Sequence, residues 1–215
     1  MLLKNLYIGL KTKPTNKLMK RLSLYLFLIF FTLQTPSQAD DIRDFQIEGM
    51  SVGDSLLEFM TKNQIDKLNK QYVYPNKEHY VFLINNRHLK LNIYDFIQTD
   101  IKNNDYDYII VSMSGFLDFR NKINECHKKR KKIDSDIKLG FKNLSIKTYN
   151  KKHRSDETKK SINYITEFNF QDGDSIVTIC EDWSTHMEKK RYTDRLRVGI
   201  MTKKFNDWIV NEAYK

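Results

Sequence analysis

The sequence predicts an α+β fold: a largely antiparallel sheet with a long central helix and a C-terminal helix packed on it. Three observations support this prediction. Apolar residues recur at steps of three and four after Gly115 and again after Thr202, which is typical of helices with one buried face. Two strand-like runs, 162–170 and 175–181, are separated only by a turn. Helices that are segregated from consecutive strands favour an antiparallel sheet over an alternating α/β fold.

The N-terminal segment has the pattern of a secretory signal peptide. Met19-Lys20-Arg21 precedes an apolar run over residues 22–33, and Ser37-Gln38-Ala39 forms a small-x-small cleavage site. The 12-residue run is short for a membrane span, which needs about 20 residues. We expect Met19 to be the true start, residues 1–39 to be the signal peptide, and cleavage to fall between Ala39 and Asp40. The mature chain, 40–215, would then be a single periplasmic or secreted α+β domain with no transmembrane helix.

The formal charge of +10 overstates the basicity of this mature chain. Residues 1–39 contain six Lys or Arg and no acidic residue, which leaves 31 basic against 27 acidic residues, or +4. Aromatic residues make up 13% of the sequence, which argues against disorder.

The first elements after the signal peptide are expected to be short. Residues 41–50 predict a strand or coil, and a short helix follows with Ser51 or Asp54 as its N-cap. A second short helix begins after Thr61, with Gln64 in the position of a capping box.

The Gly49-Met50-Ser51 turn that opens the helix pair is similar to the start of small SmpA/OmlA-type outer-membrane assembly domains. It resembles still more the opening of exported bacterial proteins with an Ile-Glu-Gly-Met-Ser-x-Gly-x-Ser-Leu motif, over Phe45–Phe59 and a little beyond. The chain lacks the lipidated cysteine of the first family and is longer. The resemblance implies a cell-envelope setting and transfers no functional residues.

The middle of the chain predicts three strands and the central helix. The strands are expected at 80–84, 88–97 and 106–111. The helix is expected at about 115–139, with Ser114 as its N-cap and Gly140 just past its end. Its predicted buried face consists of Phe116, Phe119, Ile123, Cys126, Ile133 and Ile137.

The C-terminal third predicts mostly strands. A strand at 144–148 and a polar loop at 151–161 precede a hairpin of residues 162–170 and 175–181, turned at Asp172-Gly173. A last strand at 195–201 leads through the N-cap Thr202 to a helix at about 203–214, with Phe205, Trp208, Ile209 and Ala213 on one face.

The two cysteines, Cys126 and Cys180, predict a single disulfide. Cys126 lies on the buried face of the central helix, and Cys180 shares a strand face with Ile176 and Thr178. An exported chain meets conditions in which thiols oxidise. The alternative is two free thiols; no C-x-x-C motif indicates zinc or redox chemistry.

Three kinds of pattern in the sequence could indicate a catalytic site. Gly49–Gly53 matches G-x-S-x-G, but no earlier strands exist to build a nucleophile elbow, so Ser51 is expected to cap a helix. No histidine pair has metal-binding spacing. Four acids, Asp172, Asp174, Glu181 and Asp182, flank the hairpin and are expected to be solvated turn residues.

The densest basic run follows Cys126. It comprises Lys128, Lys129, Arg130, Lys131 and Lys132 and could bind an anionic membrane surface or another polyanion. Successive helical residues cover every face, so the simpler expectation is a solvated half-helix that extends past the sheet. Export argues against nucleic acid as the partner.

The sequence therefore favours an exported, non-catalytic envelope binding or assembly module with no cofactor. Envelope proteins or an anionic membrane surface are the expected partners. One alternative is an anionic-surface binder that uses Lys128–Lys132. A second alternative is a hydrolase, whose site would bring His88, Asp182 or Ser114 into one deep pocket.

Overall fold

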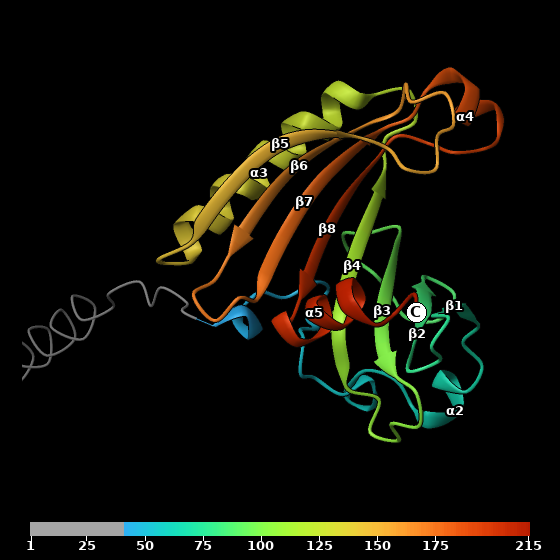
Figure 1. The fold of residues 1–215 in the computed structure, drawn as a ribbon. Helices are drawn as coiled ribbons and strands as arrows, with labels where there is room; N and C mark the ends of the chain where they lie inside the picture. The colour runs from blue at the N-terminus through green and yellow to red at the C-terminus, as the bar shows by residue number, and fades with distance from the viewer. Residues whose placement is uncertain (1–40) are drawn as a thin grey trace, which may run out of the picture. The chain divides into compact units, whose positions relative to one another are not determined.

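A computed structural model describes residues 41–215, whose strands form one eight-stranded sheet (Figure 1). The strand order is β1-β2-β3-β4-β8-β7-β6-β5, and every neighbouring pair is antiparallel. The strands are β1 (Lys70–Val73), β2 (His79–Asn85), β3 (Phe96–Lys102), β4 (Ile110–Asp118), β5 (Ser145–Lys152), β6 (Ile162–Asn169), β7 (Ser175–Asp182) and β8 (Arg195–Met201). The expected signal peptide lies outside the described residues.

The helices complete the predicted α+β fold. They are the 3-10 helices η1 (Ile42–Asp44) and η2 (Leu56–Glu58) and the α-helices α2 (Lys62–Ile65), α3 (Ile123–Gly140), α4 (Thr185–Lys189) and α5 (Lys203–Asn211). Among the described residues, no helix is long and apolar enough to cross a membrane.

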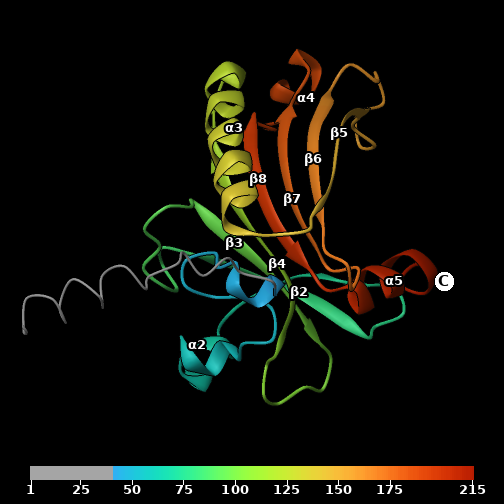
Figure 2. The same ribbon diagram turned by 90° about the vertical axis from the view of Figure 1, so that its left-hand side faces the viewer.

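The two faces of the sheet are covered differently. Side chains alternate between the faces along each strand. One face carries the larger core, which includes Phe82, Ile97 and Cys180 and packs against α3 and the segment 42–68. A smaller cluster with Val81, Phe205 and Trp208 forms under α5. The two views show α3 and α5 on opposite sides of the sheet (Figures 1 and 2).

The central helix begins later than predicted. Residues 112–118, predicted as a turn and the first helical turns, continue β4, and α3 begins at Ile123 with no side-chain cap. The small residues that look like a turn are required by packing inside the sheet. A Cβ on Gly115 would lie 2.7 Å from the ring of Tyr94. Ser114 is therefore not an N-cap; it lies within the sheet, where its Oγ accepts a hydrogen bond from Arg197 Nε at 3.1 Å.

The predicted strand at 88–97 is also wrong over most of its length, because β3 begins only at Phe96. The carboxylate of Glu48 accepts hydrogen bonds from the backbone amides of Asn92 (2.8 Å), Ile93 (2.5 Å) and Tyr94 (2.8 Å). These amides need no neighbouring strand, since a carboxylate from a distant loop satisfies them.

Smaller differences concern caps and ends. Ser55, rather than Ser51 or Asp54, caps η2 and forms a capping box with Glu58. The predicted capping box of Thr61 and Gln64 is present at α2. The C-terminal helix ends at Asn211 instead of 214, and β1 and α4 were not predicted.

Cys126 and Cys180 form a disulfide, as predicted, with their Cα atoms 6.0 Å apart. It connects α3 to β7 through the larger core. Because α3 begins at Ile123, Cys126 lies in its first turn and not at its midpoint. The predicted docking of this helix on the sheet is therefore present, with the covalent link near one end.

Candidate functional site

The rotation of α3 about its axis is fixed by polar contacts as well as by the disulfide. Asp134 is buried and accepts hydrogen bonds from Thr166 Oγ1 at 2.9 Å and Thr178 Oγ1 at 2.5 Å. These hydroxyls belong to β6 and β7. Cys126 and Asp134 are two turns apart, so they define one inward face of the helix.

The lysines of the basic run face solvent. Lys128, Lys129, Lys131 and Lys132 are all exposed, and at 100° per residue they span an arc of about 160°. The run is therefore one-sided, contrary to the expectation that it covers every face. It also does not extend past the sheet, because Asp134, beyond the run, still contacts β6 and β7.

Arg130 is the exception within the run. It is buried against the sheet, and neither Nε nor Nη1 has a hydrogen-bond partner among the described residues. Burial lowers the pKa of the Arg130 guanidinium, while the nearby Asp134 opposes that shift. Arg130 thus does not belong to the exposed surface of the run, although the sequence offered all five residues as possible anion-binding residues.

Positive charge is concentrated around α3 and β5. Residues 128–160, here called the basic region, contain 13 Lys and Arg against four Asp and Glu, a net charge of +9. The remaining described residues contain 18 basic and 22 acidic side chains, a net charge of −4. All eight residues of the edge strand β5 are exposed, including Lys147, Lys151 and Lys152. No lysine of the basic region forms an ion pair with a described residue.

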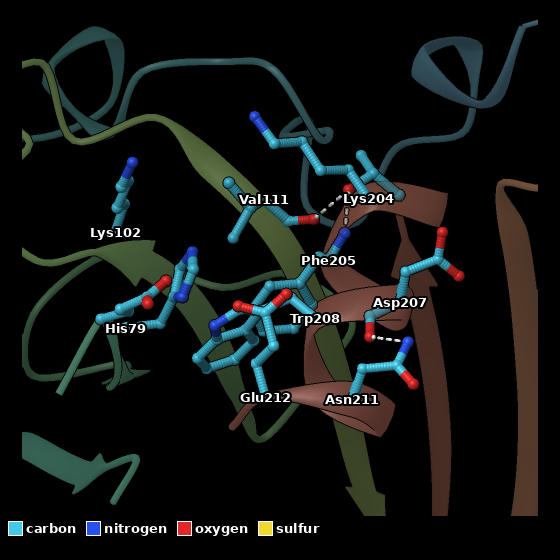
Figure 3. Close-up of a pocket in the computed structure, with 11 residues that line it drawn as sticks. His79, Lys102, Val111, Lys204, Phe205, Asp207, Trp208, Asn211 and Glu212 are labelled. Carbon is cyan, nitrogen blue, oxygen red and sulfur yellow. Dashed lines mark hydrogen bonds between the residues drawn. The ribbon is translucent and has the colours of Figure 1, made fainter. Parts of the chain in front are cut away.

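A second candidate site is a cavity of about 430 Å³ between α5 and the ends of β2, β3 and β4 (Figure 3). We call it the α5 pocket. Its aromatic and aliphatic lining includes Val111, Phe205 and Trp208, and His79 lies against Trp208 with ring centroids 4.1 Å apart. The sequence predicted the α5 face with Phe205 and Trp208, but not that β2 and β3 bring His79 and Lys102 to it.

Val111, Phe205 and Trp208 form the floor of the pocket, and charged side chains surround this floor. Lys102 and Lys204 line the pocket on one side, Asp207 comes from α5, and Glu212 directly follows this helix (Figure 3). Asp207 already binds Lys203. His79 is buried, and this burial lowers the pKa of its imidazole. The ring is therefore mostly neutral near pH 7.

A buried acid lies close to the α5 pocket. Tyr74 Oη donates to Asp100 Oδ1 at 2.9 Å, and the ring of Tyr74 packs on Trp208 with centroids 4.9 Å apart. Burial raises the pKa of Asp100 to about 6, although hydrogen bonds from Tyr74 and Ser112 oppose the shift. Asp100 thus connects the sheet electrostatically to the aromatic cluster under α5.

The structure does not bring together the residues considered for catalysis. Ser51 is buried and donates from Oγ to Phe45 O at 2.8 Å, so it is not an exposed nucleophile. His88 Nδ1 accepts from the amide of Asn85, far in the sequence from Asp182 and Ser114, and no hydrogen bond joins any two of these three side chains in the described part.

The four acids of the hairpin are likewise separated. Asp172 and Asp174 lie at its tip, where Asp174 accepts from the amide of Lys203 at 2.7 Å. Glu181 lies at the opposite end of β7 and forms an ion pair with Arg195 at 3.0 Å. Within residues 41–215, no group of three His, Cys, Asp or Glu side chains is placed to hold a metal ion.

Comparisons with protein-family models, with curated proteins and with solved structures find no match to this chain.

Proposed function

We propose that this protein is an exported, non-catalytic binding module of the cell envelope that attaches to an anionic membrane surface through its basic region. The single observation that supports the binding surface is the separation of charge: +9 on residues 128–160 against −4 on the remaining described residues. The export half of the proposal is supported by the signal-like N-terminus and by the disulfide.

The arrangement of the lysines favours a surface over a small anion. Four lysines share one exposed arc of α3 and have no ion-pair partner in the described part. They do not converge on a cavity. Leu139, which is 74% exposed, lies within the same arc by helical periodicity. A bilayer offers both anionic headgroups and an apolar layer beneath them, which matches lysines around an exposed leucine.

The expected strength follows from the number of charges. Each lysine near an anionic bilayer contributes about 1 kcal/mol, so four contribute about 4 kcal/mol, or about a thousandfold in partitioning. Such binding is reversible and weakens as salt shortens the Debye length from about 10 Å at 0.1 M to about 3 Å at 1 M.

Sedimentation with liposomes tests the proposal. We expect the wild-type protein to pellet with vesicles that contain phosphatidylserine, to be released by salt, and not to pellet with vesicles of neutral lipid alone. The combined change of Lys128, Lys129, Lys131 and Lys132 to Gln should abolish pelleting without lowering the melting temperature.

A matched control removes the same charge elsewhere. Lys67, Lys77, Lys90 and Lys215 are exposed and lie outside the basic region, so their combined change to Gln should leave most of the pelleting intact. Equal loss in both variants would mean that only net charge matters. Wild-type protein that fails to pellet, or that prefers a soluble polyanion such as heparin over vesicles, would contradict the membrane assignment.

A further inference from the structure

We propose that the α5 pocket binds a small zwitterion with a large apolar group, namely an amino acid or short peptide with an aromatic or bulky aliphatic side chain. This site is separate from the basic region and does not depend on the membrane proposal. Its volume of about 430 Å³ falls in the range of about 300–1,000 Å³ that is typical of small-molecule sites.

The floor of the pocket supplies the apolar contact. Phe205 and Trp208 are nearly parallel, with ring centroids 5.3 Å apart and an angle of 25°, and Val111 lies beside them (Figure 3). Flat aromatic side chains of this kind hold apolar groups by stacking and burial. His79, largely uncharged near neutral pH because burial lowers its pKa, extends this surface without adding a fixed charge.

One side of the pocket is arranged for a carboxylate. Lys102 comes from the end of β3 and Lys204 from the first turn of α5, and both lie on the same side of the floor (Figure 3). Neither forms an ion pair with a described residue. Glu78 also lines the pocket and offsets one of the two positive charges. A monoanionic group is therefore favoured over a phosphate or another dianion.

The helical side is arranged for an ammonium group. Asn211 donates from Nδ2 to Asp207 O at 2.8 Å, which leaves its side-chain oxygen as an acceptor. The carboxylate of Glu212 has no ion-pair partner among the described residues and lies over the floor near Trp208 in Figure 3. Cations on one side, a carboxylate on the other and an apolar floor between them match a zwitterion better than a ligand of one sign.

Nuclear magnetic resonance gives a local readout, because the chain contains only two tryptophans. Trp183 is buried beside His153 and Tyr192, away from the pocket. The probes are phenylalanine and the dipeptide Ala-Phe, each with its N-acetyl and its C-terminal amide derivative. We expect a zwitterionic probe to shift the indole resonance of Trp208 and to leave that of Trp183 unchanged, and both blocked derivatives to bind at least tenfold more weakly.

Two variants test the charges separately. The double change Lys102→Gln with Lys204→Gln should weaken binding of the zwitterion at least about tenfold, because the charge-assisted hydrogen bonds to its carboxylate are lost. It should no longer distinguish the free acid from the amide. Glu212→Gln should lose the preference for the free amine and keep the preference for the free acid.

The control is the quadruple α3 variant, in which Lys128, Lys129, Lys131 and Lys132 become Gln. It should bind the probes like the wild type. The proposal is overturned if none of the probes shifts Trp208 at millimolar concentration, if the amide and the free acid bind equally to the wild type, or if Trp183 shifts instead. A response to Ala-Phe but not to phenylalanine would assign the site to peptides.

Discussion

Replacing Asp100 by Asn is expected to stabilise the protein at neutral pH. Asp100 is only 9% exposed and lies in β3 between its cross-strand neighbours Val81 and Ser112. Burial raises its pKa from 3.8 to about 6, against the effects of hydrogen bonds from Tyr74 and Ser112 and of the charge of Arg197. At pH 7.5 the folded state must therefore hold a carboxylate that it would bind more favourably with a proton.

The sign and size follow from linkage. Because the folded pKa exceeds the unfolded pKa, the free energy of unfolding is highest below about pH 4, falls as pH rises to about 6, and is constant above. A shift of about two units corresponds to about 3 kcal/mol. Asn is close in shape to the protonated acid: its oxygen can accept from Tyr74, and its amide can donate to the Ser112 hydroxyl.

Urea unfolding of wild type and Asp100→Asn between pH 4 and pH 8 measures this effect. We expect similar free energies of unfolding near pH 4 and an advantage of about 3 kcal/mol for the variant above pH 7. Asp136→Asn, on the exposed side of α3, controls for the loss of one charge. A difference that does not change with pH, or a variant less stable than the wild type at pH 7.5, would refute the reasoning and mean that Arg197 compensates the buried carboxylate.

Three further predictions concern single contacts. Changing Cys126 and Cys180 to Ala opens a loop of 54 residues and should cost about 4 kcal/mol in the chain-entropy model; equal urea midpoints for the variant and the oxidised wild type would contradict this. Glu48→Gln should cost about 2 kcal/mol at pH 7, because three backbone amides lose a charged acceptor. Hydrogen bonds lower the pKa of Glu48 against the opposing effect of burial, so the difference should shrink in acid, and a difference that grows there would be a refutation. Asp134→Ala should cost about 3 kcal/mol, because the hydroxyls of Thr166 and Thr178 lose their acceptor and the buried Arg130 loses a nearby negative charge, and an unchanged melting temperature would show that water replaces the carboxylate.

Local patterns predicted the elements whose neighbours are close in sequence. The hairpin of β6 and β7, the strand β8 and the Thr202 cap were recognised because alternation, an Asp-Gly turn and a capping residue are all local signals. The disulfide followed from two local faces, the inward face of a helix and one face of a strand, together with the requirement that both bury apolar residues.

The errors occur where distant residues decide the local structure. Gly115 and Ser114 look like a turn, but they are small because Tyr94 and Gly199 approach them closely within the sheet. The segment 88–95 alternates like a strand, but Glu48 binds its backbone amides. In each case the residue that determines the local structure lies more than fifteen residues away in the sequence. The local pattern of apolar and polar residues therefore cannot indicate its contact.

For the two candidate sites, too, the sequence predicts only the parts that depend on residues close together in the chain. The basic run was visible as composition, but its one-sidedness depends on Asp134 and the disulfide, which set the rotation of α3. Of the α5 pocket, the sequence predicted only the apolar face of the C-terminal helix. Its other half comes from strand ends that only the sheet order brings to α5.

The two proposed sites should bind their ligands independently of each other. The lysines of α3 and the α5 pocket lie on opposite faces of the sheet and share no residue. Residues that are well separated and have no common partner contribute additively. Binding of a zwitterion should therefore leave liposome pelleting unchanged, and vesicles should leave the affinity for the zwitterion unchanged within about twofold (about 0.4 kcal/mol). A larger coupling would require α5 and α3 to move together through the sheet. Asp100 is the first residue to vary in that case, because it joins β3 to the aromatic cluster under α5 through Tyr74.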